Sequence, residues 1–189
     1  MDLILASSSP RRAELLRNAG LRFRVRSKPV EETRAPGEAP RDYALRLARA
    51  KARAAWEDRA EIVLGADTIV VLGDRVLEKP ADARDARNML TTLSGREHTV
   101  ITGICLLYPG GEIVDSESTR VWFATLDPSE IEAYVQSGEP MDKAGAYAIQ
   151  GLASKFVERI EGCFFNVVGL PAPRVYRHWK AAQGRSGPR

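Results

Sequence analysis

The chain has 189 residues, of which 44% are hydrophobic and 28% charged, and its formal net charge is +3. These values are typical of a globular domain and exclude disordered, collagen-like or mucin-like chains. The sequence has no run of 18 apolar residues, and its acidic start, MDLILASSSP, is unlike a secretory signal. We therefore expect a soluble cytoplasmic protein that forms one domain over residues 1–189.

The charged and metal-binding residue types exclude further classes of protein. The 28 cationic residues are scattered and form no basic stripe interleaved with aromatic residues, so we expect no nucleic-acid partner. The two cysteines and two histidines lie far apart in the sequence, which predicts neither a disulfide framework nor a zinc motif.

The first half of the chain alternates between strand and helix patterns. An apolar strand at 2–6 leads to Ser9 as a helix N-cap and Pro10 at the first helical position. That helix ends at Gly20, and a strand at 21–25, a proline-rich loop at 27–40 and a helix at 41–56 follow. Two β-branched runs, 62–64 and 69–72, are separated by Gly65-Ala66-Asp67-Thr68, which we interpret as a break at a strand end. A short strand at 76–77 and a helix at 82–93 come next.

The second half begins with two long strand patterns, 98–108 and 113–125, which Pro109-Gly110-Gly111 joins into a predicted hairpin. Asp127-Pro128-Ser129-Glu130 is a helix start, and that helix runs to about residue 137. Residues 138–155 give no clear pattern. A strand at 156–160, a helix at 171–182 and a polar tail at 183–189 complete an α/β fold with a mixed sheet.

Two segments could bind a phosphate and a hard metal ion. Ser7 to Arg12 place serines and two arginines at a helix N-terminus, where unpaired N–H groups favour an anion, although an ordinary capped helix explains them equally well. Asp67 follows an apolar run, and buried carboxylates are usually paired or functional. Together with the adjacent acids Glu31 and Glu32, Asp67 could hold Mg²⁺ or Mn²⁺. The alternative is that the two glutamates are solvated and that Asp67 is a turn residue bonded to its own backbone.

Three further side chains are weaker candidates. Lys51 lies on or beside the apolar face of its helix, and Lys79 lies in a loop between a strand and a helix. Gln150, in the glycine-flanked segment DKAGAYAIQG, could contact the edge of a base or simply face solvent. Residue spacing alone does not name a reaction.

Taken together, the segments resemble the Maf family of nucleoside triphosphate pyrophosphatases over nearly the whole chain. The matching pieces are LILASSSPRRAELL (3–16), ALRLARAKA (44–52), VLGADTIV (63–70), LEKPADA (77–83), LSGREHTVITG (93–103), DKAGAYAIQG (142–151) and NVVGLP (166–171). The resemblance implies a mixed, twisted sheet flanked by helices, in two lobes with a deep cleft, distantly like the inosine triphosphate pyrophosphatases. It also implies metal-dependent hydrolysis between the α and β phosphates, and it suggests a homodimer.

The resemblance assigns roles to residues. Asp67 matches the proposed proton acceptor, and Glu32 and Asp67 match the positions near the metal. The phosphate-binding positions are Ser7, Ser9, Arg11, Arg12, Lys51 and Lys79.

Three positions also distinguish branches of the family. Arg11, Thr68 and Gln150 match the branch that hydrolyses dTTP and UTP, whereas the 7-methyl-GTP branch typically carries Trp, Gln and Glu there. A glutamine offers both a donor and an acceptor to a uracil or thymine edge. The alternatives are a pyrophosphatase for 7-methyl-GTP or another modified nucleotide, and a non-catalytic, nucleotide-binding regulator of division.

Overall fold

The computed structural model describes residues 2–58 and 60–185 of the protein. One mixed sheet has the strand order β2-β1-β3-β5-β6-β7, and β4 pairs with β3. β1 is parallel to β2 and β3, whereas β4 and β7 are antiparallel to β3 and β6. The strands are β1 (Leu3–Leu5), β2 (Phe23–Val25), β3 (Ile62–Leu72), β4 (Arg75–Leu77), β5 (Glu97–Tyr108), β6 (Gly111–Phe123) and β7 (Val157–Glu161).

The predicted α/β fold with a mixed sheet is thus confirmed. The helices are α1 (Pro10–Asn18), α2 (Pro40–Ala55), α3 (Ala83–Leu93), α4 (Pro128–Gln136), α5 (Phe164–Val168) and α6 (Ala172–Arg185), with 3₁₀ helices η1 (Glu139–Asp142), η2 (Ala144–Ala146) and η3 (Leu152–Phe156). None of the helices in the described residues is long and apolar enough to cross a membrane.

The chain divides into two compact units, and β3, β5 and β6 contribute residues to both. Unit 1 comprises residues 1–68, 102–117 and 169–189, and unit 2 comprises residues 69–101 and 118–168. The division after Thr68 separates the sequence-predicted residues, because Lys79 and Gln150 belong to unit 2 and the others to unit 1. The predicted deep cleft stays a prediction.

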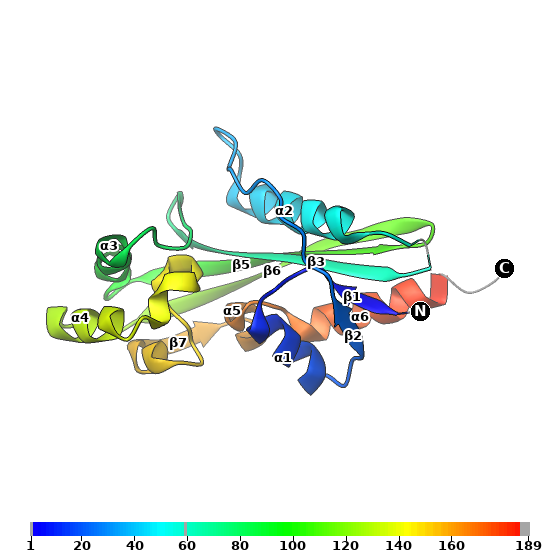
Figure 1. The fold of residues 1–189 in the computed structure, drawn as a ribbon. Helices are drawn as coiled ribbons and strands as arrows, with labels where there is room; N and C mark the ends of the chain where they lie inside the picture. Colours follow the sequence, from blue (N-terminus) through cyan, green and yellow to red (C-terminus); the bar gives the residue numbers. More distant parts are fainter. Residues whose placement is uncertain (1, 59, 186–189) are drawn as a thin grey trace. The chain divides into compact units, whose positions relative to one another are not determined.

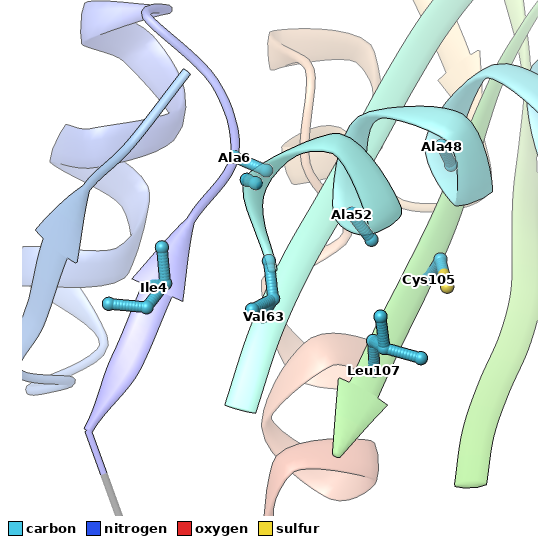
Figure 2. Close-up of a cluster of buried hydrophobic side chains, with 8 residues drawn as sticks. Ile4, Ala6, Ala48, Ala52, Val63, Cys105 and Leu107 are labelled. Atoms are coloured by element: carbon cyan, nitrogen blue, oxygen red, sulfur yellow. The ribbon is translucent and has the colours of Figure 1, made fainter. Parts of the chain in front are cut away.

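Unit 1 has helices on both faces of its strands. α2 covers one face, and α1 and α6 lie on the other (Figure 1). Small side chains of α2 pack on apolar side chains of the strands, as Figure 2 shows for Ala48 and Ala52 above Val63, Cys105 and Leu107. Burial raises the pKa of the Cys105 thiol to about 12, so this cysteine stays protonated and serves as a core residue.

Two glycines allow α2 to approach the strands closely. A Cβ atom at Gly65 of β3 would lie 2.1 Å from the Ala48 carbonyl oxygen of α2, and one at Gly103 of β5 would lie 2.3 Å from the Ala44 carbonyl oxygen. Neither contact is sterically possible, so both positions require glycine as long as α2 keeps this place.

Gly65 is also where the sequence prediction was wrong. The expected break at Gly65–Thr68 does not exist, and β3 runs without interruption from Ile62 to Leu72. Asp67 therefore lies within a strand and not at its end. Glycine suits a turn and a close backbone approach equally well, and here the second reason applies.

Unit 2 is built around a buried aromatic cluster. The rings of His98, Phe123 and Tyr147 pack edge to face with centroids 4.8 to 5.4 Å apart. The Nε2 atom of His98 lies 2.8 Å from the Tyr147 hydroxyl. α4 begins with the predicted capping box, in which Asp127 and Glu130 satisfy each other's backbone N–H groups.

Element boundaries differ from prediction mainly near the C-terminus. Phe164–Val168 form α5, which the sequence reading did not predict, since five residues are too few for a helical period to appear. α6 continues through residues 183–185 of the predicted polar tail, where Gln183 and Arg185 are good helix formers although Gly184 is a poor one. The rest of that tail, 186–189, lies outside the described residues.

His98 should make stability depend on pH. Burial lowers its pKa from 6.5 to about 4, so the folded state holds this imidazole neutral. The stability that depends on a neutral His98 is fully present above pH 6.5. It is lost as the pH falls from 6.5 towards 4, because the imidazole of the unfolded state binds a proton in this range while that of the folded state does not. We expect the loss to be about 3 kcal/mol of unfolding free energy. Urea titrations at several pH values measure it.

The control uses the protein's other histidine. His178→Asn should keep the acid-side loss, whereas His98→Gln should flatten it. Proton NMR on His178→Asn reports the titration of His98 alone, and a midpoint above pH 6 would refute the prediction.

Candidate active site

The loop after β1 is shaped by its serines. The Ser9 side chain caps α1 by accepting from the Arg12 amide, and Pro10 occupies the first turn, as predicted. The Ser7 hydroxyl is buried and accepts from the Ser9 amide at 3.2 Å. These bonds fix the backbone between a buried strand and a helix N-terminus, where the helix dipole favours an anion.

The Arg12 side chain connects α1 to other segments of unit 1. Its Nε donates to the Gly169 carbonyl at 2.9 Å, its Nη1 to the Ser7 hydroxyl at 3.1 Å, and its Nη2 to the Thr68 hydroxyl at 3.0 Å. Burial lowers the pKa of the guanidinium and Asp67 opposes that shift, but an arginine remains a cation at neutral pH. Arg12 thus places a positive charge here while tying three segments together.

The hydroxyl of Thr68 belongs to the same network. It lies 2.9 Å from the Thr102 hydroxyl and 3.2 Å from the Gly169 carbonyl oxygen. Sequence reasoning missed Thr102 and Gly169, since a threonine in a strand and a glycine in a loop carry no signal of their own. The geometry gives Thr68 a visible part in orienting Arg12, and its part in substrate choice stays a prediction.

Asp67 and Lys51 form a second group on the other face of β3. Successive residues of a strand point to opposite faces, so Thr68 reaches α1 while Asp67 reaches α2. The Lys51 Nζ lies 2.6 Å from Asp67 Oδ1 and 2.7 Å from Glu32 Oε1. The Tyr43 hydroxyl of α2 donates to the Glu32 carbonyl and so holds the proline-rich loop against the helix.

The environment of Asp67 suits proton transfer. The residue is only 7% exposed, and burial raises the pKa of its carboxyl. The cations Lys51 and Arg12 counteract that rise, and the Glu32 carboxylate adds to it. A buried carboxylate with a raised pKa and a fixed lysine partner is typical of a general base.

The predicted metal ligands fit a Mg²⁺ or Mn²⁺ ion in their chemistry. Lys51 brings Glu32 and Asp67 to one point, and carboxylate oxygens are the donors that hard cations prefer. Among residues 2–58 and 60–185, no three Asp, Glu, His or Cys side chains cluster as a ready-made metal cage. Two carboxylates are what Mg²⁺ commonly uses when substrate phosphates supply the remaining ligands.

The remaining predicted residues lie on α1 and in unit 2. Arg11 is half-buried on α1, directly before Arg12. In unit 2, Lys79 and Gln150 are both exposed. The Gly145 amide donates to the Glu78 carbonyl at 3.1 Å, so the segment that carries Gln150 is bonded to the one that carries Lys79. The structure therefore brings together Ser7, Ser9, Arg12 and Thr68, and separately Glu32, Lys51 and Asp67.

A family profile described as Maf-like protein matches residues 2–182. The chain belongs to the Maf-like family. One Maf-like relative, the dTTP/UTP pyrophosphatase of Koribacter versatilis, is 56% identical over 96% of this chain and 95% of its own length. Proteins of the same name from Vibrio cholerae and Aquifex aeolicus are 53% and 46% identical, over 89% and 94% of this chain and 91% and 93% of their own lengths.

The fold also resembles that of a solved structure whose sequence is much less similar to this chain. A HAM1 protein from Coxiella burnetii aligns over 96% of this chain and all of its own with a TM-score of 0.52. Its 17% sequence identity limits the likeness to the fold of the Maf-like chain.

Proposed function

We propose that this Maf-like chain hydrolyses dTTP and UTP between the α and β phosphates and releases the nucleoside monophosphate and pyrophosphate. Relatives that bear the name dTTP/UTP pyrophosphatase match nearly its full length at 46 to 56% identity. The observation that supports this chemistry is that Asp67 is a buried carboxylate held by Lys51. The next residue of the same strand, Thr68, accepts a hydrogen bond from Arg12.

Asp67 takes the proton of the attacking water in this mechanism. The water oxygen bonds to the α phosphorus as its proton moves to Asp67, and the bond to the bridging oxygen breaks so that pyrophosphate leaves with the electron pair. Lys51 holds the Asp67 carboxylate in place through its 2.6 Å contact. A divalent cation held by Glu32 and Asp67 would neutralise charge on the phosphoryl oxygens.

The cationic side chains bind the triphosphate. Arg11 and Lys79 are the arms we expect to contact phosphate oxygens directly, and the loop of Ser7 and Ser9 receives one phosphate at the N-terminus of α1. Because Arg12 is bonded to three protein groups, we assign it to shaping this loop and supplying positive charge there. Thr68 supports Arg12, and Gln150 contacts the base.

The proposal extends to location and partners. We expect a cytoplasmic protein that binds a nucleotide as its substrate and has no nucleic-acid or membrane partner. A homodimer is the expected assembly, and sedimentation measures it.

A nucleotide panel tests the reaction. We expect metal-dependent release of pyrophosphate from dTTP and UTP in Mg²⁺ or Mn²⁺, and its loss on adding a chelator. CTP, GTP and 7-methyl-GTP complete the panel. Preference for 7-methyl-GTP would move the chain to the other branch, and tight binding without release from any nucleotide would make it a regulator.

A further inference from the structure

The backbone around Gln150 is fixed by a small polar network within unit 2. Gln150 itself is exposed, and it lies between η2 and η3 with the buried Ile149 beside it. Two residues before it, the Ala148 amide donates to the Tyr134 hydroxyl at 3.3 Å. Two residues after it, the Leu152 amide donates to Glu139 Oε2 at 3.1 Å. The backbone is therefore bonded two positions before and two positions after Gln150.

The two anchors are bonded to each other. The Tyr134 hydroxyl donates to Glu139 Oε1 at 2.9 Å, so one phenol and one carboxylate connect the amides of Ala148 and Leu152. Tyr134 is a buried residue of α4 and cannot easily change its place. We call Tyr134 and Glu139 the clamp.

Gly151 shows how closely the clamp carboxylate approaches the loop. A Cβ atom at Gly151 would lie 2.2 Å from Glu139 Oε1, and the φ of this residue, −104°, is one that any residue adopts. A side chain at this position would therefore have to displace the Glu139 carboxylate, whereas the backbone conformation itself would accept one. The carboxylate thus lies directly against the residue that follows Gln150.

A fixed position matters because a glutamine amide recognises two kinds of base edge. Its oxygen and NH₂ group pair with the N3–H and O4 of uracil or thymine, and the same amide turned by half a revolution pairs with N3 and the amino group of cytosine. An amide that moves freely accepts both. Selection of uracil over cytosine therefore requires one favoured amide orientation, and a fixed backbone limits the positions from which the Gln150 side chain can reach the base in that orientation.

We infer that Tyr134 and Glu139 are positioning residues that make Gln150 selective for uracil and thymine nucleotides over cytosine nucleotides. This inference rests on the proposed function and adds to it the residues that set its selectivity. Neither residue needs to touch the substrate, since both act through the backbone that carries Gln150. Their loss should weaken binding of the correct base and relax discrimination while leaving the phosphate chemistry in place.

Glu139→Ala and Tyr134→Phe test the inference by steady-state kinetics with UTP and CTP. We expect each variant to raise KM for UTP and to lower the UTP-to-CTP ratio of kcat/KM about tenfold, with kcat for UTP within about threefold of the original. Glu139→Gln, which keeps an oxygen that can accept from the Leu152 amide, should recover part of the ratio. Hydrogen exchange should show faster exchange of the Ala148 and Leu152 amides in the first two variants.

Glu132→Gln is the matched control, because Glu132 is a carboxylate near Tyr134 on α4 that pairs with Arg87 of α3 at 2.5 and 2.9 Å. It should leave both the ratio and the two amides unchanged. Faster exchange with an unchanged ratio, or a wild-type protein that uses CTP as well as UTP, would overturn the inference alone. A wild-type protein that hydrolyses none of these nucleotides would overturn the proposed function and the inference with it.

Discussion

Asp67→Asn should lower kcat for UTP and dTTP by a factor of about 10² to 10⁴, the range by which a positioned general base accelerates a reaction. The amide keeps the shape of the carboxylate but accepts no proton from water. Lys51 retains its 2.7 Å contact with Glu32, and a neutral amide is less costly to bury than a carboxylate. We therefore expect a loss of unfolding free energy below the about 3 to 5 kcal/mol that removing one partner of a buried ion pair costs when no other partner remains. Pyrophosphate release and urea unfolding measure the two effects.

Asp74→Asn is the control for this substitution, because Asp74 is exposed in the turn between β3 and β4 and should leave turnover unchanged. Calorimetric titration with a nucleotide separates the roles of Asp67. Retained affinity with lost turnover supports the base. Loss of affinity in the presence of metal would instead make Asp67 a metal ligand first, and near wild-type turnover would end the assignment.

The sequence predicted the parts of the site whose signals are local. Ser9 and Pro10 mark the start of α1 because capping involves residues only a few positions apart. Lys51 was expected on or beside the apolar face of α2, and its side chain is indeed only 15% exposed. An acid directly after an apolar run likewise indicated that Asp67 would be buried, although the strand continues beyond it.

The parts that could not be predicted depend on contacts between distant residues. Thr68 contacts Thr102 and Gly169, which lie 34 and 101 positions further along the chain. No spacing rule relates such residues, so the network that holds Arg12 appears only in three dimensions. The same holds for the clamp, in which Glu139 reaches across 13 positions to the Leu152 amide.

Gly65→Ala should be strongly destabilising. The added Cβ would lie 2.1 Å from the Ala48 carbonyl oxygen and 2.6 Å from the Ala52 amide nitrogen. Both are backbone atoms of α2, so no side chain can rotate away and the helix itself must move from β3. We expect a loss of about 3 to 5 kcal/mol in unfolding free energy. Urea unfolding measures it, and a protein that no longer folds would agree with the upper end.

Gly184→Ala is the matched control, since Gly184 lies in α6 with no atom within 4 Å of an added Cβ. Alanine there should raise stability by up to about 1 kcal/mol, because glycine is the poorer helix former. Gly65→Ala should also reduce turnover wherever it still folds, since the close approach of α2 to β3 is what places Lys51 2.6 Å from Asp67. A Gly65→Ala protein with unchanged stability and turnover would contradict this placement of α2. In that case the contact between Lys51 and Asp67 would not depend on the glycine at position 65.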